Sequence, residues 1–304
     1  MQVKSPLISR KVALQYDQAL SLDASRWRHA WQTRSRYHPP VIRFDRPRKT
    51  LPISLTGPNC ALHCAHCGGV YLKHMQPIWD VHTNGETSLL ISGGCDKRGR
   101  VPVTDHLEQV IRLREGRRLN WHVGFIDEAE LRTIAPYVDV ISFDIVGDSE
   151  TAREVYGLDV SLDDYMETLD LLRSYRPVVP HLTIGLRGGK LSGERAALAA
   201  LQDKGLDRLI FIVLIPTKGT RYAQCLPPPL PQVTELFLDA RVMFPRTRLY
   251  LGCMRPYGPY RQYLDQLAVR AGLNAIVNPT RLSQSLATDL GLEIVWEEEC
   301  CALH

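Results

Sequence analysis

The sequence predicts an α/β fold in which parallel strands alternate with helices. Eight short runs of β-branched and apolar residues are separated by amphipathic segments with helical spacing. This alternation is typical of a parallel sheet built from βα units, and eight units suit a TIM-type (β/α)8 barrel. A partial, open barrel of six strands is the alternative, because the last two runs are the weakest.

The elements follow in order along the chain. Strands are expected at 52–56, 88–92, 120–125, 138–145, 180–186, 208–215, 247–252 and 274–277. Helices are expected at 104–115, 161–174, 193–204, 230–243, 260–271 and 280–290. Ser161, with Asp164 three residues later, resembles a helix N-cap.

The two ends of the chain depart from this repeat. Residues 1–50 contain a helical stretch at 12–34 and a Pro- and Arg-rich segment, and we interpret them as a helical extension packed on the barrel. The barrel itself is expected at 51–292. Residues 293–304 form a tail that carries a cysteine pair. One catalytic barrel with an extension is preferred over two domains.

Composition excludes several classes of protein. The 304 residues are 44% hydrophobic and 23% charged, which argues against disorder. No apolar run is long enough to span a membrane, and no secretion signal is visible at the start. The net charge of +4 does not indicate nucleic-acid binding. The expected location is the cytoplasm, where thiols stay reduced.

Eight cysteines are the unusual feature, and three of them lie close together. Cys60, Cys64 and Cys67 form a C-x3-C-x2-C motif directly after the first strand, at the edge where barrels build active sites. Thiolates are the donors that iron–sulfur clusters need, and three ligands on a cubane leave one iron open. Zinc held by the three thiolates and one of His63, His66 or His74 is an alternative.

The motif resembles the signature of radical S-adenosylmethionine (SAM) enzymes. The resemblance implies a [4Fe–4S] cluster on Cys60, Cys64 and Cys67, with SAM chelated by the open iron. Reduction of the cluster would cleave SAM to methionine and a 5′-deoxyadenosyl radical that abstracts a substrate hydrogen. One departure is His66, which stands where the family usually has an aromatic or aliphatic residue near the adenine.

Further positions match where this superfamily binds SAM. Gly93 and Gly94 after the second strand resemble the glycine motif that binds the SAM amine, with a plain turn as the alternative. The other expected SAM-binding or substrate-facing residues are His122, Ser142, Asp144, His181 and Gly185. Asp144 is also expected to be a catalytic residue. Its alternative is a structural barrel carboxylate, and the alternative for His181 is a histidine at a strand end.

Four of the remaining cysteines suggest a second, auxiliary iron–sulfur cluster. In the barrel interpretation Cys95 and Cys253 follow strands that end on the catalytic face, near Arg255. A tail folded over that face would bring Cys300 and Cys301 close to them. The alternative is that these thiols pack as small hydrophobes, which is the preferred interpretation for Cys225. Adjacent cysteines rarely both bind one metal, so one of the pair is expected to be the ligand, or to have a redox or persulfide role.

A longer resemblance is to the subunits of the two-protein, archaeal-type lipoyl synthase, related to biotin-synthase-like sulfur-insertion enzymes. The stretches that carry it are Ser92–Asp96, Gly99–Pro102, Asn120–Gly124, Ser142–Asp148, Pro180–His181, Gly185–Gly189, Gly252–Pro256, Gly272–Asn274 and Asn278–Pro279. Residues 1–50 contain no cysteine, which fits this type better than the single-chain lipoyl synthase.

This resemblance implies a sulfurtransferase that inserts sulfur at C6 or C8 of an octanoyl group on a lysine of a lipoyl carrier domain. The sulfur would come from the auxiliary cluster, which is consumed. Expected partners are the carrier domain, a second radical SAM lipoyl synthase subunit and a reductant such as ferredoxin or flavodoxin. Three alternatives remain: a biotin-synthase-like enzyme, a single-cluster radical SAM mutase, lyase or methylornithine-type enzyme, and a structural module that only binds a partner.

Overall fold

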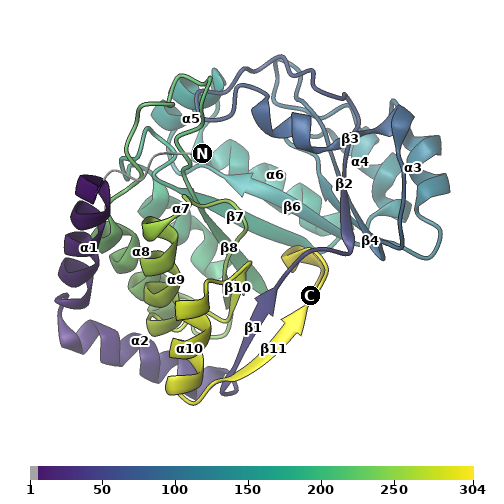
Figure 1. Ribbon diagram of the computed structural model, residues 1–304. Coiled ribbons are helices and arrows are strands. Elements are labelled where there is room, and N and C mark those ends of the chain that lie inside the picture. The colour runs from purple at the N-terminus through teal and green to yellow at the C-terminus, as the bar shows by residue number, and fades with distance from the viewer. Residues whose placement is uncertain (1–5) are drawn as a thin grey trace.

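Within residues 6–304, which the computed structural model describes, eleven strands form one sheet. The strands are β1 (Val41–Asp45), β2 (Thr50–Ser54), β3 (Gln76–Pro77), β4 (Ser88–Ser92), β5 (Arg118–His122), β6 (Val140–Ile145), β7 (Val178–Ile184), β8 (Arg208–Val213), β9 (Arg248–Leu251), β10 (Ala275–Val277) and β11 (Glu293–Glu297). Their order is β11-β1-β10-β9-β8-β7-β6-β5-β4-β2-β3, and neighbouring strands run parallel. The sheet curls into an open barrel with helices outside it (Figure 1).

The predicted strands are confirmed, with small shifts at their ends. All eight expected runs form neighbouring strands, from β2 and β4 through β10. The sheet also contains three strands outside that set. β11 matches the strand-like start of the tail. β1 lies in the Pro- and Arg-rich part of the extension, where no strand was predicted. The extension therefore adds a strand to the sheet as well as helices.

Ten α-helices accompany the strands in the described part of the chain. They are α1 (Pro6–Leu20), α2 (Ala24–Tyr37), α3 (Leu107–Leu113), α4 (Glu128–Ile134), α5 (Ser149–Tyr156), α6 (Leu162–Tyr175), α7 (Glu194–Leu201), α8 (Leu230–Met243), α9 (Pro259–Arg270) and α10 (Arg281–Asp289). Short 3-10 helices lie at Val70–His74, Ile78–Asp80, Ala135–Tyr137, Gln202–Lys204 and Cys301–Leu303. No helix within residues 6–304 is long and apolar enough to cross a membrane.

Helix capping explains where the helix predictions succeed and fail. The Ser161–Asp164 capping box at the start of α6 is confirmed. The helical stretch expected at 12–34 is confirmed, but it is divided between α1 and α2, because Asp23 accepts a hydrogen bond from the Ser25 N–H and starts α2 as a new helix. The unpredicted α4 and α5 start in the same way, at Asp127 and Asp148.

The chain itself ties the two ends of the sheet together. β1 continues into β2 through residues 46–49, although the two strands lie towards opposite ends of the sheet. The residues after β11, here called the tail segment (298–304), cross the remaining gap. The Lys49 N–H donates to the Glu298 carbonyl at 2.8 Å, and the Cys300 N–H donates to Thr50 Oγ1 at 2.7 Å. The tail segment therefore closes the barrel near the starts of its strands.

Two apolar clusters result from this arrangement. The larger cluster fills the space between the sheet and the surrounding helices, as the alternation of apolar side chains predicts. The smaller cluster lies inside the barrel. It consists of inward-facing strand residues and tail residues: Val140, Val179, Ile210, Tyr250, Ala275, Val277, Cys301 and Ala302, with Ile212, Cys300 and Leu303 beside them. The tail segment thus forms the floor of the barrel.

Candidate active site

A loop with three cysteines follows β2, at the C-terminal edge of the sheet. Cys60, Cys64 and Cys67 are free, partly buried thiols. The loop turns tightly after Cys64, whose carbonyl accepts hydrogen bonds from the N–H groups of Cys67 at 3.1 Å and Gly68 at 2.8 Å. His63 has a φ of 46°, in the left-handed region. The structure thus gathers the three predicted ligands in one loop at the edge where parallel barrels build active sites.

The three thiols act on one another electrostatically. Burial raises the pKa of the Cys64 thiol far above its usual range, and Cys67 and Cys60 add to this effect. Burial also raises the pKa of Cys67, again with a contribution from Cys60. Three thiolates at this place therefore need a positive charge beside them. An iron–sulfur cluster supplies that charge, so the donor set fits such a cluster.

Gly94 fixes how closely the cysteine loop approaches the end of β4. A Cβ on Gly94 would lie 1.8 Å from the Asn59 carbonyl oxygen and 2.6 Å from Cys60 Cα. The Gly94 N–H donates to Thr56 Oγ1 at 2.7 Å, and Thr56 Oγ1 donates to the Asn59 carbonyl at 2.9 Å. Gly94 does not have a positive φ. A glycine stands here because the two backbones touch, which a plain turn would not require.

Cys95 lies beside the cysteine loop. Its carbonyl accepts a hydrogen bond from the Ala61 N–H at 2.8 Å and lies 3.9 Å from Cys60 Sγ. Burial raises the pKa of the Cys95 thiol to about 12, and the nearby Cys60, Asp96, Asp144 and Cys67 raise it further. Among the four cysteines expected to share an auxiliary cluster, Cys95 is thus a neighbour of the first motif.

Polar side chains of β5, β6 and β7 meet inside the barrel. Ser142 Oγ donates to Asn120 Oδ1 at 2.9 Å. The rings of His122 and His181 lie with their centroids 5.6 Å apart. Asp144 stands opposite His181 in the strand register, and its charge partly offsets the burial that lowers the pKa of His181. The residues predicted from three separate strands therefore form one group.

Asp144 and His122 face a hollow inside the barrel. Asp144 has an exposed surface, yet burial raises the pKa of its carboxyl group. A side chain with both properties faces a space that is enclosed by protein and open to water. Burial also lowers the pKa of His122 to about 3, so its imidazole is neutral at pH 7. The hollow thus offers a carboxylate and a neutral imidazole to a polar ligand.

His66 and Gly185 are both closely packed against other residues of the protein. His66 is packed with its ring edge-on to Tyr156 at 5.7 Å, and its buried Nδ1 has no hydrogen-bond partner within the described chain. Burial lowers the pKa of His66 to about 4. Gly185 has a φ of 72°, and a Cβ there would lie 2.7 Å from Pro228 Cγ. Their contact with SAM stays a prediction.

The tail segment does not cover the catalytic face, so the expected path of the tail is wrong. Cys300 and Cys301 enter the barrel from the side of the strand starts. Cys300 Sγ accepts a hydrogen bond from Asn120 Nδ2 at 3.4 Å, directly below the group that contains His122. The Cys301 carbonyl accepts from Arg43 Nη2 at 3.3 Å. Cys301 is buried, and Cys300 is partly buried, among inward-facing strand residues.

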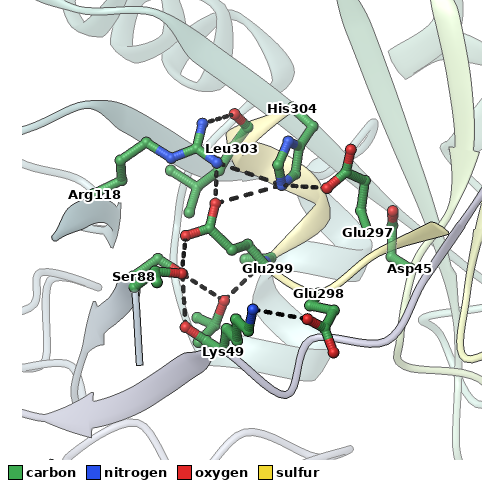
Figure 2. A network of polar contacts seen from close by, with 12 residues as sticks. Asp45, Lys49, Ser88, Arg118, Glu297, Glu298, Glu299, Leu303 and His304 are labelled. Atoms are coloured by element: carbon green, nitrogen blue, oxygen red, sulfur yellow. Dashed lines mark hydrogen bonds and ion pairs between the residues drawn. The ribbon is translucent and has the colours of Figure 1, made fainter. Parts of the chain in front are cut away.

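Hydrogen bonds and ion pairs hold the tail segment in this position (Figure 2). Arg118 at the start of β5 forms an ion pair with Glu299 and donates to the Leu303 carbonyl at 2.9 Å. Thr87 Oγ1 donates to the other carboxylate oxygen of Glu299 at 2.5 Å. Arg208, at the start of β8, donates to the Ala302 carbonyl at 2.9 Å. The anchors all lie at or beside the strand starts.

Cys253 belongs with the tail cysteines. It follows β9, is exposed to the interior space, and has a pKa that burial raises with a contribution from Cys300. The neighbouring Arg255 is fully buried in an ion pair with Asp265, with Nε 2.7 Å from Oδ1, so its charge is balanced within the protein. The four predicted auxiliary ligands therefore divide into Cys95 on one side and Cys253 with the Cys300–Cys301 pair on the other.

Sequence reasoning missed three residues of this region. Thr56 links the cysteine loop to Gly94. Tyr156 on α5 contacts His66. It could not be found from the sequence because the helix α5 was not predicted. Asp45, at the end of β1, is buried near the tail cysteines and paired with Arg43 at 2.7 Å. The prediction that Cys225 packs against the core is confirmed.

Zinc on the cysteine loop stays an alternative from the sequence. Within residues 6–304, no group of three or more His, Cys, Asp and Glu side chains, the three cysteines included, is gathered around a single metal-ion position. The buried ring of His66 faces Tyr156, so it is occupied by packing.

Comparison with known proteins shows the fold. No protein-family model and no curated protein matches the sequence. Among solved structures, methylornithine synthase (PylB) is similar with a TM-score of 0.60 and 14% identity, covering 92% of this chain and 93% of its own. The FeFe-hydrogenase maturase HydG from Carboxydothermus hydrogenoformans is similar with a TM-score of 0.63 and 14% identity, covering 98% and 80%. The predicted α/β barrel is therefore confirmed.

Proposed function

We propose that this chain is a radical SAM enzyme. One observation carries the proposal: the C-x3-C-x2-C loop follows β2 and touches the Gly93–Gly94 segment after β4, so both predicted motifs form one site. The likeness to methylornithine synthase supports it, since a methylornithine-type radical SAM enzyme was among the activities that the sequence predicts. A [4Fe–4S] cluster bound here would supply the electron that cleaves SAM to methionine and a 5′-deoxyadenosyl radical.

The protein's own residues would bind and enclose the reactants. Cys60, Cys64 and Cys67 would hold the cluster, and the backbone of Gly94 packs directly against their loop. The polar hollow lies on the same side of the sheet. Asp144 and the neutral His122 offer hydrogen bonds to the hydroxyl groups of a ribose or to a polar part of the substrate.

The test uses anaerobically reconstituted protein with dithionite and SAM. We expect about four irons for this site, broad absorption near about 400 nm, and 5′-deoxyadenosine as a product. Replacing Cys60, Cys64 and Cys67 together with alanine should abolish all three signals. Cys225→Ala is the matched control, because Cys225 packs against the core. Wild-type protein that binds iron but never cleaves SAM would overturn the proposal.

The finer proposal is sulfur insertion into an octanoyl-lysyl group of a lipoyl carrier domain. The thiols inside the barrel support it: Cys253 and the Cys300–Cys301 pair influence one another electrostatically, and Cys300 contacts Asn120. Cys253 and one thiol of the pair would be ligands of an auxiliary iron–sulfur cluster. A cluster there would supply sulfide to the substrate carbon, with one SAM consumed for each sulfur inserted. Partners in this proposal are the carrier domain, a second radical SAM lipoyl synthase subunit and a ferredoxin or flavodoxin in the cytoplasm.

Iron counting separates this proposal from its alternative. The likeness to methylornithine synthase over nearly the whole chain favours a mutase or lyase with one cluster. About four irons per chain support that alternative, whereas about six to eight support sulfur insertion. A single-turnover reaction with an octanoylated carrier or peptide then tests the substrate. Absence of a thiolated product, with SAM cleavage intact, would reject sulfur insertion while leaving the radical SAM assignment in place.

A further inference from the structure

Cys95 is a fourth thiol at the edge of the three-cysteine loop. Its carbonyl is hydrogen-bonded to Ala61, the residue after Cys60, at 2.8 Å. The backbones of Gly94 and Asn59 touch, so no side chain fits between the two segments. The backbone of Cys95 is therefore fixed relative to Cys60, beside the cluster loop.

Cys95 and the cluster loop border one common space. Cys60 and Cys95 line the same cleft, and Cys60 Sγ lies 3.9 Å from the Cys95 carbonyl oxygen. The Cys95 thiol is partly buried and accepts or donates no hydrogen bond to a side chain in the described chain. Cys95 packs at the margin of the main core, as Cys225 does, but unlike Cys225 it also borders the three-cysteine loop.

A cleft of about 910 Å³ reaches the same place from outside. Its lining includes Cys60, Gly94, Cys95, Asp96 and Arg100. Water and small oxidants can therefore approach the loop at Cys60. A cluster held by only three thiolates has one iron without a protein ligand, and that iron is the one most easily lost on oxidation.

We propose that Cys95 is a displaceable fourth ligand, which caps the open iron of the cluster when SAM is absent. This inference rests on the proposed radical SAM function and adds a resting state to it. On capping, the Cys95 thiol forms a sulfur–iron bond and releases its proton to solvent. When SAM arrives, its amino and carboxylate groups take that iron, the sulfur–iron bond breaks, and the thiolate regains a proton. No electron is transferred in either direction.

The first test measures loss of the fourth iron. Reconstituted wild type, Cys95→Ala and Cys95→Ser are oxidised with ferricyanide without SAM, and the [3Fe–4S] species is quantified by electron paramagnetic resonance. We expect several-fold more [3Fe–4S] in Cys95→Ala than in wild type, and equally low amounts in both with SAM present. Cys225→Ala serves as the control and should match wild type. Equal amounts in wild type and Cys95→Ala without SAM would overturn the proposal.

The second test measures SAM affinity. An internal ligand that must be displaced weakens the apparent affinity, so its removal strengthens it. Cys95→Ala should therefore have a several-fold lower Kd for SAM than wild type. An unchanged or higher Kd would overturn the cap, as would loss of all iron from both Cys95 variants, which would make Cys95 a permanent ligand. If wild type itself holds no cluster, the proposed function fails instead.

Discussion

Gly94 and Cys60 are in backbone contact: a Cβ on Gly94 would lie 2.6 Å from Cys60 Cα. The contact joins the end of β4 to the cysteine loop after β2. Because these are two parallel strands that pair directly, the contact sets the position of the loop on the C-terminal edge of the barrel. Its removal is the most direct structural test of the site.

Gly94→Ala should abolish cluster assembly while Gly93→Ala largely preserves it. A Cβ on Gly94 collides with backbone atoms, whereas one on Gly93 meets side chains of Thr56 and Val101 at 3.3 Å. Iron content and absorbance after reconstitution measure the effect, with circular dichroism to check folding. Equal iron in the two variants would mean that the loop tolerates displacement from β4.

Glu299→Gln should release the tail segment. The Glu299 carboxylate is mostly buried and is held by Thr87 and Arg118. Losing its charge leaves Arg118 without its acidic partner, and because Arg118 is partly exposed to solvent the expected cost is about 1–2 kcal/mol. Lys49→Met is the control, because the Lys49–Glu298 pair is half-exposed and such pairs contribute about 0–1 kcal/mol. Limited proteolysis near residue 298 is the readout, and equal cleavage of both variants would contradict the prediction.

Asp265→Asn should destabilise the barrel strongly. The Asp265 carboxylate accepts from Arg255 Nε at 2.7 Å and from the Thr280 N–H at 2.9 Å, and both charged side chains are fully buried. Breaking one partner of a buried pair typically costs about 3–5 kcal/mol. Urea unfolding measures the free energy. The double variant Arg255→Met/Asp265→Leu should lose less, because it leaves no buried charge; a larger loss would show that the pair stabilises on balance.

The protein should become less stable in mild acid because the partly buried imidazole of His38 resists protonation in the folded state. Burial, with help from Arg241, lowers the pKa of His38 to about 4, below its unfolded value near 6.5. The unfolded chain therefore takes up the proton first as the pH falls, and stability is lost between about pH 6.5 and pH 4. Between pH 7 and pH 5 we expect this residue to contribute about 1–2 kcal/mol of that loss, allowing for its partial exposure. His38→Gln should remove this share, as measured by denaturant unfolding at both pH values. An unchanged pH dependence in His38→Gln would refute it.

The repeat of strands and helices was predictable from sequence because its signals are local. Short β-branched and apolar runs located all eight central strands, and 3.6-residue patterns located six of the helices between and after them. β1 was not predicted because Pro39 and Pro40 precede it and Arg43 interrupts its apolar pattern, although Ile42 and Phe44 are fully buried. Its stability comes from pairing with β10 and β11, which are more than 200 residues away in the chain.

The candidate site likewise has parts that could be located from the sequence and parts that could not. The cysteine loop and the glycines could be located because each motif is contiguous. The position of Cys300 could not, because its surroundings are made by Thr50 and Asn120, which are far from it in sequence. A sequence pattern also does not show from which end a tail enters a barrel. That choice depends on Arg118 and Arg208, which offer hydrogen bonds to the tail carbonyls at the strand starts.

The floor of the barrel has a consequence for how the protein matures. The hydrogen bond between the Cys300 N–H and Thr50 joins residues 250 positions apart. Contacts of such long range carry a high loop-closure entropy and form late in folding. The tail segment is also synthesised after every strand that it touches. We therefore expect residues 298–304 to enter the barrel interior after the strands that they contact have paired.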